Sequence, residues 1–459
     1  MSRLVVVSNR VADPGDARAR AGGLAVALQD ALRVRGGIWF GWSGHVVADP
    51  PNTPRIVKAG QVVYATMDLS RSMYNAYYNG YANRALWPLF HYRLDLTAFS
   101  QQNSSGYLQV NRQFAEQLIP QLRSDDLIWV HDYHLIPLGE ELRNRNMAQR
   151  MGFFLHTPFP AMEILTALPS HASLVRAMTA YDVVGFQTAN DLRAFLDYVI
   201  NEAGGEILGD HLVRAWGRTF RAEIFPIGID TEDFAKMSAD AASGRRARKI
   251  RASNGQLQWL IGVDRLDYSK GLVERFCAFE RFLENHPQFR LKVSLIQIAP
   301  PSRSEVPEYK EIRRSLEAEA GHLNGRFADL EWTPLNYINR SFTRGELASY
   351  YRASRVGVVT PLRDGMNLVA KEYVDSQDPG VLVLSRFAGA ARELKDALIV
   401  SPFDIDSVAD AMARGLTMPV DERRQPWSAM MAPLRTNTLA AWRDSFLTVL
   451  ADAPFGAPQ

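Results

Sequence analysis

The feature that most constrains the fold of this chain is an alternation of short apolar runs with longer helical patterns. The first set of runs lies at 4–7, 127–130, 152–155 and 183–187, and helical patterns separate them. A run that is apolar at every position predicts a strand buried on both faces, as in a parallel sheet covered by helices on both sides. The chain is therefore expected to be an α/β protein.

The same alternation begins again in the second half of the chain. The later apolar runs lie at 259–263, 291–298, 356–359, 381–384 and 398–400. Turn-forming residues at Pro226-Ile227-Gly228 separate the two sets. We therefore expect two Rossmann-like domains, 1–228 and 229–438, with a ligand cleft between their strand carboxyl ends. A last helical pattern, within 439–455, is expected to pack on either domain and would complete the first if it packs there.

Composition excludes several classes of protein. Hydrophobic residues make up 47% and charged residues 22%, which is typical of a globular chain and not of a disordered one. The net charge of +2 gives no bulk attraction to nucleic acid or to an anionic membrane. The single cysteine, Cys277, excludes an intramolecular disulfide and metal sites built from several cysteines. No run approaches the roughly 18 apolar residues of a membrane span or resembles a signal peptide, so we expect a cytoplasmic protein.

Familiar nucleotide and metal motifs are missing from the sequence. It contains neither GxxxxGK[ST] nor GxGxxG after a strand, which argues against a P-loop NTPase and a dinucleotide oxidoreductase. His131 and His134 flank Asp132, but no further His or Cys cluster completes a metal site. Asp404-Ile405-Asp406 resembles a phosphatase motif, although a helix cap explains it better. The basic run 243–251 lacks interleaved aromatics, which favours a solvated connector over a nucleic-acid patch.

Residues that suit a phosphate follow several of the predicted strands. Glycine at a helix start lets an anion approach the free backbone amides, and cations beside such a turn can neutralise a diphosphate. Surface charge and helix capping remain the alternative for each of them. The candidates are Arg10, Gly22, Gly23, Arg265, Lys270 and Arg303.

Residues that suit a polyhydroxylated ligand occupy other strand ends and loops. Glu372 is able to accept two hydroxyl hydrogen bonds, or it stabilises the helix dipole. Aromatic faces also bind sugars, although aromatic residues more often belong to a core. The aromatic segments 77–80 and 85–88 are expected on irregular chain. The candidates are Tyr78, Trp87, Asp132, His156, Asp364, Gly365, Met366, Asn367 and Glu372.

Longer strings of the sequence contain these residues. They include WFGWSG, VHDYHL, GFFLHTPFP, VDRLDYSKGL, QIAPPSR and TPLRDGMNLVAKEYV. Taken together, these strings resemble the trehalose-6-phosphate synthases, most closely the bacterial single-function form. The resemblance runs in order from Ser8 to about Met418, and Asp264 and Glu331 are small departures from the family pattern.

The resemblance implies a GT-B fold and a retaining glucosyl transfer. The donor would be a nucleotide-glucose, UDP-glucose above all, and the acceptor glucose 6-phosphate, giving trehalose 6-phosphate and a nucleoside diphosphate. It also implies no cofactor or metal, no nucleic-acid or membrane partner, and a homodimer or homotetramer. A relative with another acceptor (a glucosylglycerol-phosphate synthase or a pseudo-glycosyltransferase) and a catalytically silent sugar-phosphate sensor stay open as alternatives.

The resemblance also implies roles for individual residues. Arg265, Lys270, Asp132 and His156 would be catalytic, and the departing phosphate would itself accept the proton of the acceptor hydroxyl on the same face of the sugar. The acceptor would be held by Arg10, Tyr78, Trp87, Asp132 and Arg303. The donor would be held by Gly22, Gly23, His156, Arg265, Lys270, Asp364, Gly365, Met366, Asn367 and Glu372.

Overall fold

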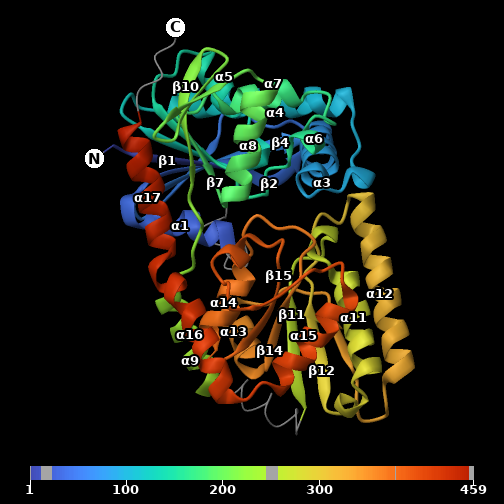
Figure 1. Ribbon diagram of the computed structural model, residues 1–459. Coiled ribbons are helices and arrows are strands. Elements are labelled where there is room, and N and C mark those ends of the chain that lie inside the picture. Colours follow the sequence, from blue (N-terminus) through green and yellow to red (C-terminus); the bar gives the residue numbers. More distant parts are fainter. Residues whose placement is uncertain (1, 12–22, 244–256, 378, 454–459) are drawn as a thin grey trace. The chain divides into compact units, whose positions relative to one another are not determined.

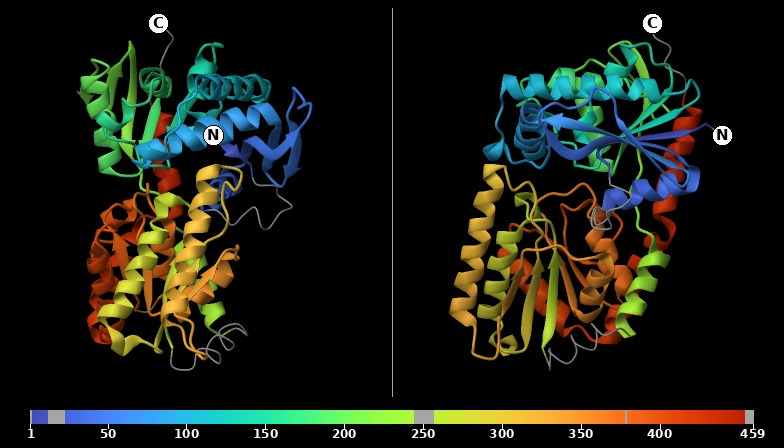
Figure 2. Two further views of the ribbon diagram at one scale, coloured as in Figure 1. Left: turned by 90° about the vertical axis from the view of Figure 1, so that its right-hand side faces the viewer. Right: turned by 180° about the vertical axis from the view of Figure 1, so that it is seen from behind.

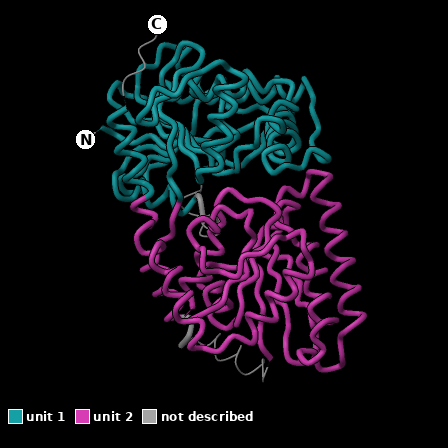
Figure 3. The backbone as a smooth tube through the Cα atoms, in the orientation of Figure 1, with its two compact units in different colours: residues 1–226, 442–459 teal, residues 227–441 magenta. Residues whose placement is uncertain are grey.

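The chain divides into two compact units, which Figure 3 shows in separate colours. The computed structural model describes residues 2–11, 23–243, 257–377 and 379–453. Unit 1 comprises residues 1–226 and 442–459, and unit 2 comprises residues 227–441. Gly22, the basic run from 244 and residues 454–455 of the last predicted helix lie outside the described residues.

Unit 1 contains a ten-stranded sheet in the order β3-β4-β2-β1-β5-β6-β7-β10-β9-β8. Its central strands are parallel, and only the pairs β3–β4, β10–β9 and β9–β8 are antiparallel. The strands are β1 (Leu4–Arg10), β2 (Gly37–Val47), β3 (Arg55–Ala59), β4 (Val62–Ser70), β5 (Leu127–His131), β6 (Arg150–Phe154), β7 (Val183–Phe186), β8 (Glu206–Gly209), β9 (Leu212–Ala215) and β10 (Arg218–Ile224).

The predicted strands of unit 1 are confirmed as β1, β5, β6 and β7, whose apolar residues are almost completely buried. Both β2 and β4 are absent from the prediction. Polar positions, such as Ser43 and Asp68, interrupt their apolar runs; β2 is continuously buried only over its first half, and burial in β4 largely alternates along the strand. Burial on alternate residues gives a weaker signal than a continuous apolar run.

The last helix, α17 (Leu439–Asp452), packs on unit 1 from residue 442 onward, and Figure 2 shows it in red beside that sheet. The Trp129 ring lies 4.8 Å from Trp442 and stacks at 4.8 Å on Phe446. Gly152 of β6 makes room for this helix, because a Cβ there would lie 2.6 Å from the Phe446 ring.

The other helices of unit 1 are α1 (Gly23–Arg35), α2 (Arg71–Met73), α3 (Trp87–Phe90), α4 (Gln101–Leu118), α5 (Leu138–Arg143), α6 (Met162–Leu165), α7 (His171–Met178), α8 (Ala189–Asn201) and the 3₁₀ turns Leu94–Leu96, Ile119–Gln121 and Tyr133–Leu135.

The prediction of irregular chain at 77–80 and 85–88 is wrong. These residues belong to η2 (Tyr74–Leu86), a helix of π type, and to α3, which follows it. The Trp87 amide donates to the carbonyl of Ala82, five residues earlier. Close packing against α4 stabilises this wide helix, because a Cβ at Gly80 would lie 2.5 Å from the Asn103 side chain. Glycine, asparagine and proline suggested loops here, but tertiary contacts override that local preference.

Unit 2 is a six-stranded parallel sheet in the order β13-β12-β11-β14-β15-β16. The second set of predicted strands is confirmed by β11 (Gln258–Val263), β12 (Val293–Ile298), β14 (Val356–Val359), β15 (Val381–Ser385) and β16 (Leu398–Val400), to which the structure adds β13 (Leu335–Ile338).

Helices cover both faces of this sheet (Figure 1). On one side α11 (Leu272–Asn285) contacts α12 (Pro307–Phe327) and α15 (Ile405–Thr417); on the other, α14 (Leu368–Ser376) contacts α9 (Thr231–Ser243), α13 (Arg344–Ala353) and α16 (Val420–Thr436). Asp404 caps α15 by accepting from the Ser407 amide at 3.0 Å, which confirms the helix-cap interpretation. In the described ranges, no helix has both the length and the hydropathy of a membrane span.

A buried arginine organises the carboxyl ends of these strands. Arg275, on α11, is only 1% exposed. Its guanidinium donates to Asp264 at 2.7 Å, Gln297 at 2.8 Å and Thr360 at 3.0 Å, which lie at or just beyond the ends of β11, β12 and β14. Gly262 leaves room for it, since a Cβ there would lie 2.5 Å from the guanidinium.

The Asp264→Asn substitution should destabilise unit 2, because it leaves the Arg275 charge buried without its counter-ion. Removing one partner of a buried ion pair costs about 3–5 kcal/mol. The loss should appear as a lower opening free energy for the amides of β11 and β12, measured by hydrogen exchange with mass spectrometry. Arg281→Gln, at a 43%-exposed side chain on the same helix, is the control and should leave the protection of these amides nearly unchanged. Equal protection in both variants would contradict the structural role of the pair.

Candidate active site

In unit 1, the parallel register brings three candidate residues to one edge of the sheet. Ser8 of β1 pairs with His131 of β5, and His131 pairs with Phe154 of β6. Arg10, Asp132 and His156 lie one or two residues beyond these positions. Parallel strands that end together place the side chains that follow them at the same edge.

Asp132 and His156 are held together by a hydrogen bond. The His156 amide donates to the Asp132 carboxylate at 3.2 Å. The backbone of Asp132 has φ 74°, a strained conformation for a residue with a side chain, and such strain clusters at functional sites. Burial lowers the pKa of His156 to about 3, so its ring is neutral near pH 7. Its Nε2 atom lies 3.1 Å from Nδ1 of the buried His131.

Aromatic rings from η2 and α3 pack beside the same edge. The Tyr78 ring stacks on His134 with centroids 5.8 Å apart and planes at 10°. Trp87 is 5% exposed, and its ring lies 5.6 Å from that of Tyr133. Both candidate aromatics therefore contact the residues that directly follow Asp132.

Arg10 is exposed at the end of β1, and a glycine of β2 makes space for its head group. Gly44 has φ +92°, and a Cβ there would lie 2.7 Å from two guanidinium nitrogens of Arg10. A side chain at position 44 would push the guanidinium away. Arg10 is consequently placed by the close approach of the two strands.

In unit 2, Lys270 lies in a tight turn after β11, η6 (Tyr268–Lys270). The Asp267 carboxylate caps the turn by accepting from the Ser269 amide at 3.0 Å. The next residue, Gly271, has φ +61°, and a Cβ there would lie 2.3 Å from the carbonyl of Thr360. The turn thus tolerates only glycine at this position. Arg265 is exposed at the start of the same loop.

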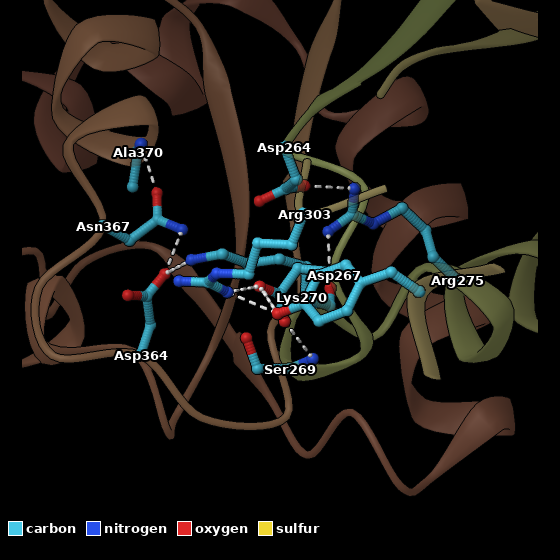
Figure 4. A network of polar contacts seen from close by, with 10 residues as sticks. Asp264, Asp267, Ser269, Lys270, Arg275, Arg303, Asp364, Asn367 and Ala370 are labelled. Atoms are coloured by element: carbon cyan, nitrogen blue, oxygen red, sulfur yellow. Dashed lines mark hydrogen bonds and ion pairs between the residues drawn. The ribbon is translucent and has the colours of Figure 1, made fainter. Parts of the chain in front are cut away.

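The side chain of Lys270 points toward the segment 364–367, as Figure 4 shows. Its ammonium lies 2.5 Å from the Asp364 carboxylate, which also accepts from Asn367 at 2.9 Å. Asn367 in turn caps α14 by accepting from the Ala370 amide at 3.0 Å. Further along the backbone, the carbonyl of Met366 accepts from the Ala390 amide at 2.7 Å. Asp364 is therefore brought beside Lys270 and is bonded to Asn367, and Gly365 and Met366 lie between Asp364 and Asn367 in the chain.

Glu372 lies one helical turn beyond Asn367 and has a side chain that is 14% exposed. Burial raises its pKa to about 7, and the Arg344 guanidinium, 3.9 Å away, opposes that rise. Arg344 also lies 3.2 Å from Asp233 and covers the Phe234 ring. The carboxyl group therefore changes its protonation state close to neutral pH.

Arg303 follows β12 and lies close to the η6 turn. Its guanidinium is 2.8 Å from the second oxygen of Asp267 and hydrogen-bonds the Tyr309 hydroxyl. The side chain is 5% exposed. The Asp267 carboxylate thus binds Arg303 with one oxygen and caps the turn that carries Lys270 with the other.

Asp267, Arg275 and Arg344 belong to these networks but were not among the predicted site residues. Arg275 had a usable signal, because it lies between Leu272, Phe276 and Phe279 on the apolar face of α11. A charged residue on a buried helix face requires a buried partner. Asp267 lies in a turn, where an aspartate is commonly explained as a helix cap. Arg344 can be recognised only from the tertiary structure.

Gly23 opens α1, as predicted, whereas Gly22 falls outside the described residues. Over the parts of the chain that the structure describes, no group of three or more His, Cys, Asp or Glu residues is arranged to hold a metal ion.

The family model and the curated relatives match this chain over almost its whole length. The model of glycosyltransferase family 20 matches residues 4–452. The trehalose-6-phosphate synthase of Sinorhizobium fredii is 49% identical over 456 residues, which cover 98% of each chain. The curated Escherichia coli K12 protein of the same name is 49% identical over 98% of this chain and 95% of its own.

Solved structures are also similar to this chain over almost its whole length. The UDP-forming α,α-trehalose-phosphate synthase of Burkholderia xenovorans in complex with glucose 6-phosphate is 51% identical, with a TM-score of 0.95 over 98% of this chain and 100% of that one. A structure of the E. coli protein bound with UDP-2-fluoro glucose is 48% identical, with a TM-score of 0.93 over 98% of this chain and 99% of that one. The expected GT-B fold class is confirmed, and the chain belongs to glycosyltransferase family 20.

Proposed function

We propose that the chain transfers glucose from UDP-glucose to glucose 6-phosphate with retention, forming α,α-trehalose 6-phosphate and UDP. The observation that carries this function is the placement of Arg265, Lys270 and Asp364 at the carboxyl edge of the unit 2 sheet. The relatives of known structure that bind glucose 6-phosphate and UDP-2-fluoro glucose support it, since they match the chain over 98% of its length.

The donor binds chiefly to residues of unit 2. Arg265 and Lys270 neutralise the diphosphate, and the 364–367 segment with its amides binds the glucose. Glu372 accepts hydrogen bonds from the ribose hydroxyls. Gly23, and Gly22 before it, lie at a helix start whose amides favour a phosphate. His156, neutral near pH 7, is suited to hydrogen-bond a sugar hydroxyl.

The acceptor binds through two cations and a set of polar and aromatic side chains. Its phosphate carries about −1.5 to −2 charges near neutral pH. Arg10 and Arg303 provide charge-assisted hydrogen bonds to that phosphate. Tyr78 and Trp87 pack against the sugar, and the Asp132 carboxylate accepts from its hydroxyls.

The reaction proceeds on one face of the donor sugar. The bond between the anomeric carbon and the diphosphate breaks first, and its electron pair stays on the departing phosphate oxygen. The anomeric hydroxyl of the acceptor then bonds to that carbon from the same face and gives its proton to the phosphate oxygen. Fixed cations stabilise the charge that develops on the oxygen, so Arg265 and Lys270 act most strongly in the transition state.

Incubation with glucose 6-phosphate and each of UDP-, ADP- and GDP-glucose tests the function. Release of UDP with formation of trehalose 6-phosphate supports it, and absence of turnover with every donor favours a silent sensor instead. Another product from a different acceptor would favour the related transferases. We also place the reaction in the cytoplasm, where nucleotide sugars and sugar phosphates occur, and propose a homodimer or homotetramer, which light scattering can test.

Arg265→Ala should lower kcat about 100- to 1,000-fold with a smaller change in the donor KM. Removal of one preorganised group that stabilises developing charge commonly has an effect of this size. Arg281→Ala, on the exposed side of α11, is the matched control and should keep the parent kcat. Steady-state release of UDP measures both, and a kcat of Arg265→Ala within tenfold of the parent would contradict its role.

Binding of UDP-glucose should strengthen as the pH rises from 6 to 8. The pKa of Glu372 is raised to about 7, so the carboxylate that accepts the ribose hydroxyls forms only as the pH passes that value. With one such group the dissociation constant should fall up to about tenfold over this range. Calorimetric titration measures it, and UDP-glucose itself does not titrate near pH 7.

Glu372→Gln serves as the control for this pH dependence. The amide does not titrate, so its dissociation constant should be flat between pH 6 and 8. An equal pH dependence in the variant and the parent would show that another group is responsible.

A further inference from the structure

Asp267 is a completely buried carboxylate in the loop between β11 and α11. It is 0% exposed, although it follows a strand end at which its neighbour Arg265 is exposed. Burying a carboxylate is costly unless hydrogen bonds and opposite charges compensate it. The contacts of its two carboxylate oxygens therefore show which parts of the loop Asp267 holds in place.

The first oxygen, Oδ1, fixes the turn that carries Lys270. It accepts from the Ser269 amide at 3.0 Å, which caps η6. The carbonyl of Asp267 also accepts from the Lys270 amide at 3.1 Å. The backbone amides of Ser269 and Lys270 are therefore both hydrogen-bonded to Asp267.

The second oxygen, Oδ2, fixes Arg303. It accepts from the Arg303 guanidinium at 2.8 Å and from the Tyr309 hydroxyl at 2.7 Å, as Figure 4 shows for Arg303. The Arg303 guanidinium also covers the Tyr309 ring at 5.4 Å. The backbone of Arg303 has φ 45°, so both its backbone and its side chain are held in a particular conformation.

We propose, on the basis of the function proposed above, that Asp267 is a positioning residue that aligns the acceptor-phosphate cation Arg303 with the donor-phosphate cation Lys270. One oxygen of this carboxylate binds the Arg303 guanidinium and the other caps the turn that carries Lys270, so the Arg303 guanidinium and the Lys270 backbone keep a fixed separation. Arg303 then meets the acceptor phosphate in an orientation that is already set, and little side-chain entropy is lost on binding.

The Asp267→Asn substitution distinguishes the role of the Ser269 contact from that of the Arg303 contact. The amide oxygen still accepts from the Ser269 amide and retains the cap of η6. The amide nitrogen replaces Oδ2 and does not accept from Arg303, so only the acceptor side loses its attachment. The KM for glucose 6-phosphate should rise roughly tenfold or more, as expected for a lost charge-assisted hydrogen bond, while the KM for UDP-glucose stays within about twofold.

Two further variants serve as matched controls. Tyr309→Phe removes one hydroxyl but leaves the ion pair of Asp267 and Arg303, so its effect on the acceptor KM should be clearly smaller. Asp267→Ala removes both attachments and should lower kcat as well, because the Lys270 turn loses its cap. If Asp267→Asn does not fold, Asp267→Ser keeps a capping oxygen while being too short to reach Arg303.

A double-mutant cycle with Arg303→Ala distinguishes positioning from general structural damage. If Asp267 acts through Arg303, Asp267→Asn should not raise the acceptor KM further in the Arg303→Ala background. Additive effects, or parallel changes in both KM values, would overturn the positioning role and leave the proposed function intact. An Arg303→Ala variant with an unchanged acceptor KM would instead refute the acceptor role of Arg303.

Discussion

The carboxyl edge of the unit 2 sheet depends on the guanidinium of Arg275, which is buried and always charged. A buried charge costs several kcal/mol unless it is paired and fully hydrogen-bonded. Its partners Asp264, Gln297 and Thr360 come from three different strand ends, and the carbonyl of Lys270 is a fourth contact at 3.4 Å. The hydrogen bonds of this one side chain therefore fix the relative position of three strands and the turn that carries Lys270.

Unit 1 organises its edge in a different way, mostly with neutral groups. Burial lowers the pKa values of His131 and His156 and raises that of Tyr77, so these side chains are uncharged near pH 7. Stacking and hydrogen bonds place them, for example from the Tyr77 hydroxyl to Asn9 at 2.8 Å. Asp132 and the exposed Arg10 then provide the charge at this edge. A neutral framework suits a sugar, whereas a charged framework suits a diphosphate.

The sequence was sufficient to predict the parallel strands, because a run such as Ile128–Val130 is apolar at every position and buried on both faces. It was also sufficient to place candidates at the strand ends, since that rule depends only on strand direction. It failed for η2, which packs closely against another helix at Gly80, where a Cβ would lie 2.5 Å from the Asn103 side chain. It also failed for Asp267, because the sequence does not show that the two oxygens of one carboxylate serve residues 269 and 303.

In the function proposed above, the carboxylate beside Lys270 limits how strongly an intact diphosphate is bound. Lys270 lies 2.5 Å from Asp364, so part of its field is already compensated before the donor binds. An interaction accelerates the reaction only to the extent that it is stronger in the transition state than with the bound substrate. The ammonium has three N–H donors, of which Asp364 occupies one, and charge that develops on the departing oxygen gains from the others. A cation that is fixed and partly neutralised therefore favours departure of the phosphate over tight binding of the donor.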